Sequence, residues 1–427
     1  MSFASFSLDA TLLEGVRAAG YEKPTPIQSQ AVPEVLEGRD LLGLARTGSG
    51  KTAAFVLPIL QRLIQAKAPR RGPLRVLVLA PTRELALQIH ETFASLGGRT
   101  GFRSAAVFGG VGMVPQLKAL KSATVCVACP GRLLDLMNRG EADLSRVDTL
   151  VLDEADRMLD MGFLPDIRKI LAALPAKRQN LLFSATMPQD MRELCGSILQ
   201  DPAVVRVASD TPAASVSHSF YSVPQHLKAD FLESLLKKTP HDCVLVFTRT
   251  KHKAKSLAQR LERRGWNATS LQGNLSQSRR QQALDGFRQG TFRIMVATDI
   301  AARGIDCERI THVVNFDMPD TAETYTHRIG RTGRVDRTGE AMTLVNNADK
   351  LPVRSIEHLL GRRITLQRLD DFDYDAPKTA QPVSRKPSTP ASGKQARTGK
   401  PNRPAQPGKP SRGADKKSPT PKRIFLP

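Results

Sequence analysis

An apolar run that passes directly into a glycine-rich loop and then a helix constrains the fold of this chain more than any other feature. Residues 41–44 are apolar or glycine, residues 45–52 read Ala-Arg-Thr-Gly-Ser-Gly-Lys-Thr, and residues 53–63 have helical spacing. This strand–loop–helix order is typical of a P-loop. Its glycines let backbone N–H groups surround a phosphate, and the helix N-terminus adds a positive field. We therefore expect Lys51 to reach the outer phosphates of a nucleotide, although Ala45 stands where the general pattern has its first glycine.

A second motif further along the chain supplies acidic partners for this loop. Residues 150–152 form an apolar strand candidate that runs into Asp153-Glu154-Ala155-Asp156. At the end of such a strand, Asp153 can hold Mg²⁺ together with Thr52, and Glu154 can orient or deprotonate a water molecule. The two motifs together predict hydrolysis of a nucleoside triphosphate.

The rest of the chain repeats one pattern of short apolar runs and longer amphipathic stretches. Strand candidates are residues 41–44, 76–79, 124–128, 150–152, 181–183, 244–247, 294–297 and 312–316, and helical spacing marks residues 85–96, 254–264 and 280–287. Strands that alternate with helices predict parallel β-sheets built from βαβ units, an α/β fold class. We expect a first domain over residues 1–208, a linker over 209–218, a second domain over 219–369 and a tail over 370–427.

The charge of the chain is strongly positive and unevenly spread. There are 63 Lys and Arg against 41 Asp and Glu, a net charge of +22, and residues 376–427 contain 13 basic residues, one acidic residue and 11 prolines. An excess of this kind attracts polyanions such as nucleic acid. The tail is almost free of apolar residues before Ile424, so we expect a disordered, basic, proline-rich arm. A linker that only improves solubility is the alternative.

Composition also indicates the compartment. The 427 residues contain five cysteines and no apolar run near the ~20 residues of a membrane helix. The N-terminus has no basic stretch followed by an apolar core, so a secretory signal is not expected. These observations favour a cytoplasmic protein without membrane partners.

Several further motifs follow one another in a fixed order. Residues 20–28 read Gly-Tyr-Glu-Lys-Pro-Thr-Pro-Ile-Gln, 81–86 read Pro-Thr-Arg-Glu-Leu-Ala, 184–186 read Ser-Ala-Thr, 297–306 read Ala-Thr-Asp-Ile-Ala-Ala-Arg-Gly-Ile-Asp, and 327–334 read His-Arg-Ile-Gly-Arg-Thr-Gly-Arg. Together with the Asp-Glu-Ala-Asp box, they resemble the motifs of DEAD-box ATP-dependent RNA helicases over residues 1–368, and those of the bacterial RhlE-type group most of all. The resemblance implies two tandem RecA-like domains, RNA-stimulated ATP hydrolysis, and local unwinding of duplexes or remodelling of ribonucleoprotein.

The resemblance also implies which residues bind and hydrolyse ATP with Mg²⁺. A glutamine amide suits the Hoogsteen edge of adenine, which favours ATP over GTP. The implied nucleotide-binding residues are Phe3, Tyr21, Gln28, Ala45, Arg46, Thr47, Gly48, Ser49, Gly50, Lys51, Thr52, Gly304 and Asp306. The implied catalytic residues are Lys51, Thr52, Asp153, Glu154, Ser184, Thr186, His327, Arg331 and Arg334, with the last two arginines as arginine fingers.

RNA is the implied partner, bound through its backbone and so without sequence preference. The implied RNA contacts are Pro81, Thr82, Arg83, Gly109, Gly110, Pro130, Gly131, Arg132, Arg249, Thr250, Gln277, Arg280, Thr298 and Arg303. Ribosomal or RNA-turnover assemblies are the expected settings. An ATP-gated RNA clamp without unwinding, a processive DNA translocase and a catalytically silent RNA-binding scaffold are the alternatives.

Two positions depart from the family pattern. Arg46 stands where glutamine is common, and Cys129 stands where threonine usually precedes Pro-Gly-Arg. Loss of that hydroxyl removes a hydrogen bond worth on the order of 1 kcal/mol. Cys126 and Cys129 also form a Cys-x-x-Cys pair, but a zinc site needs four ligands and no second pair exists.

Overall fold

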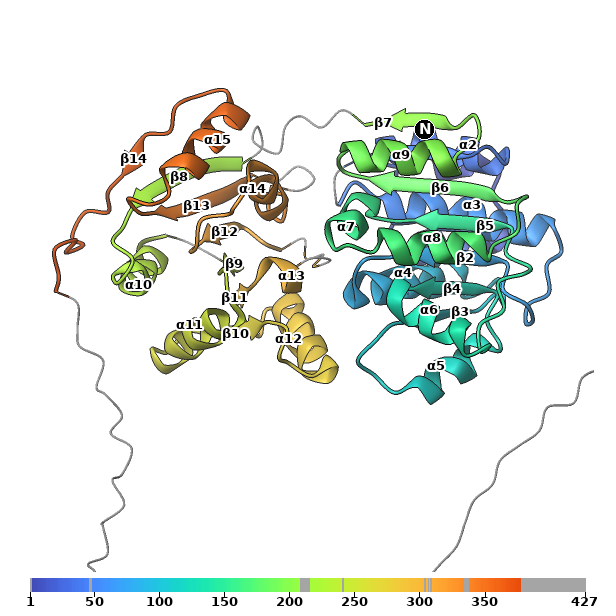
Figure 1. The fold of residues 1–427 in the computed structure, drawn as a ribbon, viewed down its shortest axis with the longest axis horizontal. Coiled ribbons are helices and arrows are strands. Elements are labelled where there is room, and N and C mark those ends of the chain that lie inside the picture. Colours follow the sequence, from blue (N-terminus) through green and yellow to red (C-terminus); the bar gives the residue numbers. More distant parts are fainter. Residues whose placement is uncertain are drawn as a thin grey trace, which may run out of the picture. The chain divides into compact units, whose positions relative to one another are not determined.

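The computed structural model describes residues 2–45, 48–207, 216–239, 242–302, 305, 307, 309–333 and 338–377. These residues form two seven-stranded parallel sheets, each with helices on both faces (Figure 1). Among them, no helix combines the length and apolarity needed to cross a bilayer. The prediction of an α/β protein with tandem RecA-like domains is confirmed.

The first sheet has the strand order β3-β4-β2-β5-β6-β1-β7. Its strands are β1 (Leu41–Leu44), β2 (Val76–Leu79), β3 (Ser104–Val107), β4 (Val125–Ala128), β5 (Thr149–Leu152), β6 (Gln179–Ser184) and β7 (Ala203–Arg206). Four central strands, β2, β4, β5 and β6, are buried along their whole length. Burial on both faces explains the continuous apolar runs of β2 and β4 and the apolar centres of β5 and β6.

Helices cover the two faces of this sheet in chain order. One face packs against α1 (Ala10–Ala18), α2 (Pro26–Leu36), α3 (Lys51–Gln65) and α4 (Arg83–Gly97), preceded by the 3₁₀ helix η1 (Phe3–Phe6). The other packs against α5 (Met113–Leu120), α6 (Pro130–Asn138), α7 (Ala155–Asp160), α8 (Leu164–Ala172) and α9 (Gln189–Ile198). Figure 1 shows α6, α8 and α9 on one side and α2, α3 and α4 on the other.

The second sheet has the order β10-β11-β9-β12-β13-β8-β14. Its strands are β8 (Val216–Ser222), β9 (Val244–Phe247), β10 (Ala268–Leu271), β11 (Ile294–Ala297), β12 (His312–Asn315), β13 (Gly339–Val345) and β14 (Leu366–Gln367). Helices α10 (Lys228–Lys238) and α11 (Lys251–Arg263) cover one face. Helices α12 (Gln277–Gln289), α13 (Asp299–Ala302), α14 (Ala322–Ile329) and α15 (Lys350–Leu360) cover the other.

The two strand orders are the same order repeated, because each strand of the second sheet takes the place of the strand seven earlier in the first. Strand β8 therefore corresponds to β1, β9 to β2, and β12 to β5. In parallel sheets of this kind, ligands bind beyond the carboxyl ends of the strands. Corresponding loops of the two domains can thus be compared directly.

Two predicted boundaries need correction. Strand β8 begins at Val216, inside the expected linker 209–218, because Val216 is buried and pairs with Gly339 of β13; residues 208–215 lie outside the described residues. The expected tail 370–427 also begins too early. Phe372 and Tyr374 pack edge-on to each other at 5.0 Å between ring centroids, and both rings lie against Phe231 of α10. Residues 378–427, which carry the predicted disordered arm, are outside the described residues.

Candidate functional site

The P-loop residues that the structure describes lie at the carboxyl end of β1. Gly48 and Gly50 have φ angles of +81° and +91°, a backbone conformation that glycine adopts without strain. Lys51 is the first residue of α3, and its buried Nζ donates to Ala45 O at 2.7 Å. The Ser49 hydroxyl is buried and has no hydrogen-bond partner among the described residues. Arg46 and Thr47 lie outside the described residues.

Gln28 connects the P-loop to helix α2. Its Oε1 accepts from Thr25 N at 3.0 Å, and its Nε2 donates to Gly50 O at 3.1 Å. A Cβ at position 50 would lie 2.5 Å from this Nε2, so only glycine permits the approach. The amide predicted to recognise adenine therefore touches the loop predicted to hold the phosphates.

The two aromatic residues predicted for the nucleotide site stack on each other. The ring centroids of Phe3 and Tyr21 are 6.2 Å apart, with 25° between their planes. Phe3 is buried and Tyr21 is 37% exposed. Tyr21 thus offers the accessible ring of the pair.

The carboxylates after β5 are buried and differ in their electrostatics. Desolvation raises the pKa of Asp153 to about 6, although Lys51 opposes the rise. Burial would also raise the pKa of Glu154, but Arg157, Arg331 and Lys51 outweigh it and lower that pKa to about 2. The Glu154 carboxylate is therefore ionised at neutral pH, and Arg157 Nη1 holds its Oε2 at 2.6 Å. Glu154 also has a positive φ of +51°, a conformation that is strained for a non-glycine residue.

Asp156 joins this strand end to the Ser-Ala-Thr motif after β6. Its Oδ2 accepts from Ala185 N at 3.1 Å and from both Thr186 N and Thr186 Oγ1 at 2.9 Å. Ser184 Oγ in turn donates to Thr186 O at 2.7 Å. Sequence reasoning predicted Ser184 and Thr186 but missed Asp156 and Arg157; the last Asp of the Asp-Glu-Ala-Asp box was the available signal.

These residues fit ATP with Mg²⁺. A phosphate oxygen would satisfy the buried Ser49 hydroxyl, and a cation would stabilise the desolvated Asp153 carboxylate. Across the described part of the chain, no group of three or more His, Cys, Asp and Glu side chains could hold a metal alone. Mg²⁺ is usually held by one or two protein ligands and by substrate phosphates. Asp153 and Thr52 would hold the ion here.

The residues predicted to contact RNA in the first domain follow β2, β3 and β4. Thr82 caps α4 by accepting from Leu85 N at 3.2 Å, which aims Arg83 out of the helix start. The Arg83 guanidinium lies against Gly110 and leaves no room for a Cβ at that position. Both Nη atoms of Arg132 donate to Val111 O at 3.5 Å. Because the strands are parallel, Pro81, Gly109, Pro130 and Gly131 lie at this same edge.

Cys129, at the start of α6, carries a buried and unreactive thiol. Burial, with a contribution from Glu84, raises the pKa of this thiol to about 12, and burial does the same for Cys126. The two side chains belong to the cores on opposite faces of the first sheet. Neither thiol is therefore activated as a nucleophile or metal ligand.

In the second domain, the predicted RNA contacts follow the corresponding strands β9, β10 and β11. Thr250 caps α11 by accepting from Lys253 N at 3.2 Å. Arg249 is half-exposed, and its backbone N–H donates to Asp317 Oδ2 at 2.9 Å. Gln277 begins α12, and Thr298 directly follows β11. The edge that carries these residues corresponds to the edge that carries Arg83 in the first domain.

Arg280, which was predicted as an RNA contact, forms an ion pair with the first domain. Its side chain is buried, with Nε at 2.8 Å and Nη2 at 2.7 Å from Glu84 Oε1. Arg83 Nη1 donates to Gln277 Oε1 at 3.3 Å. A phosphate could reach Arg280 only if the ion pair with Glu84 opened.

In the His-Arg-Ile-Gly-Arg motif, Arg328, Ile329 and Arg331 are buried. Arg331 Nη1 donates to Ile305 O at 2.8 Å. Desolvation, helped by the charge of Arg157, lowers the pKa of His327. Arg328, which was not predicted as a site residue, forms two hydrogen bonds of 2.6 and 2.7 Å with Asp299. The predicted residues Arg303, Gly304, Asp306 and Arg334 lie outside the described residues.

Comparison with known proteins identifies the family. Residues 25–194 match the DEAD/DEAH box helicase family, and residues 227–336 match the helicase conserved C-terminal domain. The ATP-dependent RNA helicase DeaD of Escherichia coli K12 is 44% identical over 363 residues, covering 84% of this chain and 57% of the relative. The DEAD-box ATP-dependent RNA helicase CshA of Bacillus subtilis is 39% identical over 375 residues, covering 87% and 75%.

Solved structures agree with this result. Dbp5 of S. cerevisiae bound to RNA and ADP BeF3 superposes with a TM-score of 0.77 at 31% identity, covering 86% of this chain and 95% of that one. A DEAD box protein of Methanococcus jannaschii gives 0.52 at 37% identity, covering 86% and 99%. The chain belongs to the DEAD-box family of ATP-dependent RNA helicases. It spans 57% of the length of DeaD, and its similarity to DeaD and CshA does not separate the subgroups, so the RhlE-type subgroup stays a prediction.

Proposed function

We propose that this protein is an RNA-stimulated ATPase that binds RNA by its backbone and uses ATP hydrolysis to unwind short duplexes or remodel ribonucleoprotein. The observation that carries the proposal is the position of Asp156. Its carboxylate is bonded to the Ser-Ala-Thr segment, and its neighbours Asp153 and Glu154 stand beside Lys51. Hydrolysis or release of the bound phosphates can therefore act through residues 153–156 on the Ser-Ala-Thr segment that follows β6.

The residues divide the hydrolytic work in a simple way. The glycines of the loop and Lys51 bind the phosphates, and Gln28 recognises the adenine edge. Mg²⁺, when bound, neutralises charge on the phosphates. Glu154 is ionised and held by Arg157, so it can accept a hydrogen bond from a water molecule and orient it for attack.

Arg331 is the proposed source of positive charge from the second domain, with Arg334 as its predicted companion. Arg331 already contributes to the low pKa of Glu154. During hydrolysis it would stabilise the charge that develops on the transferred phosphate. Because this arginine and Lys51 belong to different domains, ATP can control how the domains meet and therefore how RNA is held.

RNA is proposed to lie along the strand ends that carry Arg83 and Arg132 in the first domain and Arg249 and Thr298 in the second. Their donors suit phosphates and 2′-hydroxyls, which supports binding without sequence preference. The basic residues of 378–427 would add nonspecific attraction. Ribosomal or RNA-turnover assemblies in the cytoplasm are the proposed setting, and RNA crosslinked in cells would identify the target.

Strand release from a short fluorescent RNA duplex tests the activity. Release should require hydrolysable ATP and should be lost in Lys51→Ala, while the exposed-lysine control Lys118→Ala keeps it. Binding that depends on ATP without any strand release would instead identify a clamp. Equal stimulation of the ATPase by DNA would favour the translocase alternative.

A further inference from the structure

The loop between β8 and α10 corresponds by strand order to the P-loop, but it cannot hold a triphosphate. Residues 223–227 read Val-Pro-Gln-His-Leu and contain no glycine. Val223 N donates to Val345 O at 2.8 Å, and Leu227 N donates to Pro224 O at 2.9 Å. Two backbone donors of this loop are therefore already used, and Pro224 has no backbone N–H to offer.

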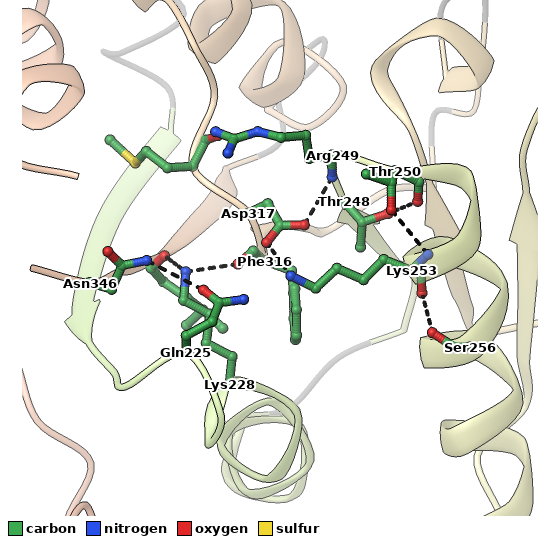
Figure 2. Close-up of polar contacts among 12 residues, drawn as sticks. Gln225, Lys228, Thr248, Arg249, Thr250, Lys253, Ser256, Phe316, Asp317 and Asn346 are labelled. Atoms are coloured by element: carbon green, nitrogen blue, oxygen red, sulfur yellow. Dashed lines mark hydrogen bonds and ion pairs between the residues drawn. The ribbon is translucent and has the colours of Figure 1, made fainter. Parts of the chain in front are cut away.

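Lys228 stands where the P-loop lysine would be. Like Lys51, it is the first residue of the helix that follows the loop, and it is only 1% exposed. Its Nζ donates to Phe316 O at 3.2 Å and to Leu344 O at 2.6 Å, and the first of these bonds is visible in Figure 2. The ammonium thus ties the carboxyl end of β12 to β13.

Retaining this charge in the interior is costly. Desolvation lowers the pKa of Lys228 to about 8, although Asp349 and Asp317 oppose the change. A buried ammonium normally requires compensating partners, and here two carbonyl oxygens supply them. A methionine of similar length would fill the same space without the desolvation cost, so packing alone does not explain a lysine.

The segment held by Lys228 leads directly to predicted RNA contacts. Asp317 follows Phe316, and its Oδ2 accepts from Arg249 N at 2.9 Å while its Oδ1 accepts from Lys253 Nζ at 2.6 Å. Lys253 also lies 5.0 Å from the centroid of the Phe316 ring. Figure 2 shows the Asp317 carboxylate between the backbone nitrogen of Arg249 and the side-chain nitrogen of Lys253. This one carboxylate therefore positions both the Arg249 backbone N–H and the Lys253 ammonium group.

An open cavity of about 220 Å³ borders this arrangement and is lined by Lys228, Arg249, Lys253, Asp317 and Asn346, among others. Asp317 already neutralises Lys253, and Arg249 Nη2 reaches Asp320 Oδ1 at 2.9 Å. The partly buried pair with Asp317 makes Lys253 a poor site for an anion, and the polar groups of the cavity are organised around Asp317. The pair between Arg249 and Asp320 is exposed to solvent, so it contributes little free energy and a phosphate can replace Asp320.

We infer that Lys228 is a positioning residue for RNA binding: it holds the Phe316–Asp317 segment so that Asp317 can orient Arg249 toward an RNA phosphate. The first residue of α3, Lys51, is the proposed ATP contact in the first domain, whereas the corresponding first residue of α10, Lys228, supports RNA binding in the second. This inference rests on the proposed function, because it takes Arg249 as an RNA contact. Arg328 Nη1 also donates to Asp317 O at 2.7 Å, so the segment keeps a second anchor when Lys228 is replaced.

The test compares Lys228→Met with Lys237→Met, a matched change on the exposed side of the same helix. Full-length variants are assayed for steady-state ATPase activity over a series of RNA concentrations. Lys228→Met should raise the RNA concentration for half-maximal stimulation about tenfold, the loss of roughly one hydrogen bond to a charged group. The kcat at saturating RNA and the KM for ATP should stay within about twofold of wild type, because no ATP contact of the first domain changes. Lys237→Met should behave as wild type.

A double-mutant cycle with Arg249→Ala separates positioning from general destabilisation. If Lys228 acts through Arg249, the RNA affinity of the double variant should be no lower than that of the single variant with the lower RNA affinity. Additive losses, or an unchanged half-maximal RNA concentration in Lys228→Met, would overturn the inference. If Lys228→Met does not fold, as judged by its melting curve, Asp317→Asn replaces it in the same cycle, with the same criterion.

Different results would overturn the role of Lys228 and the proposed function. No effect of Arg249→Ala on RNA affinity, with RNA stimulation intact, would overturn the role of Lys228 while leaving the enzyme an RNA-dependent ATPase. An ATPase that RNA does not stimulate at all would remove the proposed function and the inference with it.

Discussion

Replacement of Asp156 by asparagine should destabilise the first domain and weaken the response of the ATPase to RNA. The carboxylate is 3% exposed, and one oxygen, Oδ2, accepts three hydrogen bonds from Ala185 and Thr186. Oδ1 accepts a fourth from Arg157 N at 3.0 Å. An amide has only one oxygen, so Asp156→Asn can keep at most one of the two sets.

The magnitude follows from the kind of bond that is lost. If the amide oxygen faces Thr186, three bonds to a charged acceptor become bonds to a neutral one, a change of about 1 kcal/mol each, and the bond from Arg157 N is lost. The expected loss in unfolding free energy is about 4 kcal/mol. For a domain of about 200 residues that corresponds to a fall in Tm of roughly 8–16 °C.

The single tryptophan provides an internal control for this measurement. Trp266 lies in the second domain, so its fluorescence reports that domain, while circular dichroism follows both. Asp156→Asn should lower the circular dichroism transition of the first domain and leave the Trp266 transition in place. Asp160→Asn, an exposed change on the same helix, should have little effect. A Tm within 1 °C of wild type, or an equal shift in the Trp266 signal, would refute the reasoning.

Three further changes have defined outcomes. Gly50→Ala should weaken ATP binding at least tenfold in a fluorescent-nucleotide titration, because its Cβ would strike Gln28 and its φ of +91° is strained for alanine by ~1–2 kcal/mol; unchanged affinity would contradict this. Cys129→Thr should raise Tm slightly, and it should tighten RNA binding by at most about 1 kcal/mol, because the new hydroxyl could cap α6, whose N-cap residue Cys129 makes no side-chain cap bond. Weaker RNA binding would show that the thiol only packs. Removal of residues 378–427 should leave kcat similar but reduce the slope of log RNA affinity against log salt, by roughly 0.7 for each phosphate no longer neutralised; parallel salt plots would favour a solubilising linker.

The strands that could be predicted from the sequence include those whose own residues form an apolar run. Strands β2, β4, β9 and β11 are buried on both faces, so each appears as an unbroken apolar run. The strands that escaped prediction include β3, β7, β10 and β14, which lie at the sheet edges and are partly exposed. An edge strand buries only part of its surface, and its composition resembles that of a loop.

The site residues also include some with a local sequence signal and some without one. The P-loop and the Asp153–Glu154 pair are each a contiguous motif, and each follows the strand that precedes it in the sequence, β1 and β5. The bonds from Asp156 to Thr186 and from Lys228 to Phe316 join segments far apart in the chain. No local pattern marks such partners, because they meet only through the strand order. Phe372 and Tyr374 are predicted as part of the tail for a similar reason: four aspartates in residues 370–375 make the segment polar, and their packing partner Phe231 lies far away in the sequence, on α10.

The RNA dependence of steady-state ATP hydrolysis tests the central claim most directly. The rate should rise severalfold or more with single-stranded or duplex RNA and not with DNA of the same sequence. Glu154→Gln should abolish turnover in the presence of RNA while retaining binding of ATP and RNA, since the substitution keeps the shape but removes the ionised carboxylate that orients water. Hydrolysis that is indifferent to RNA, or near-normal turnover in Glu154→Gln, would contradict the account.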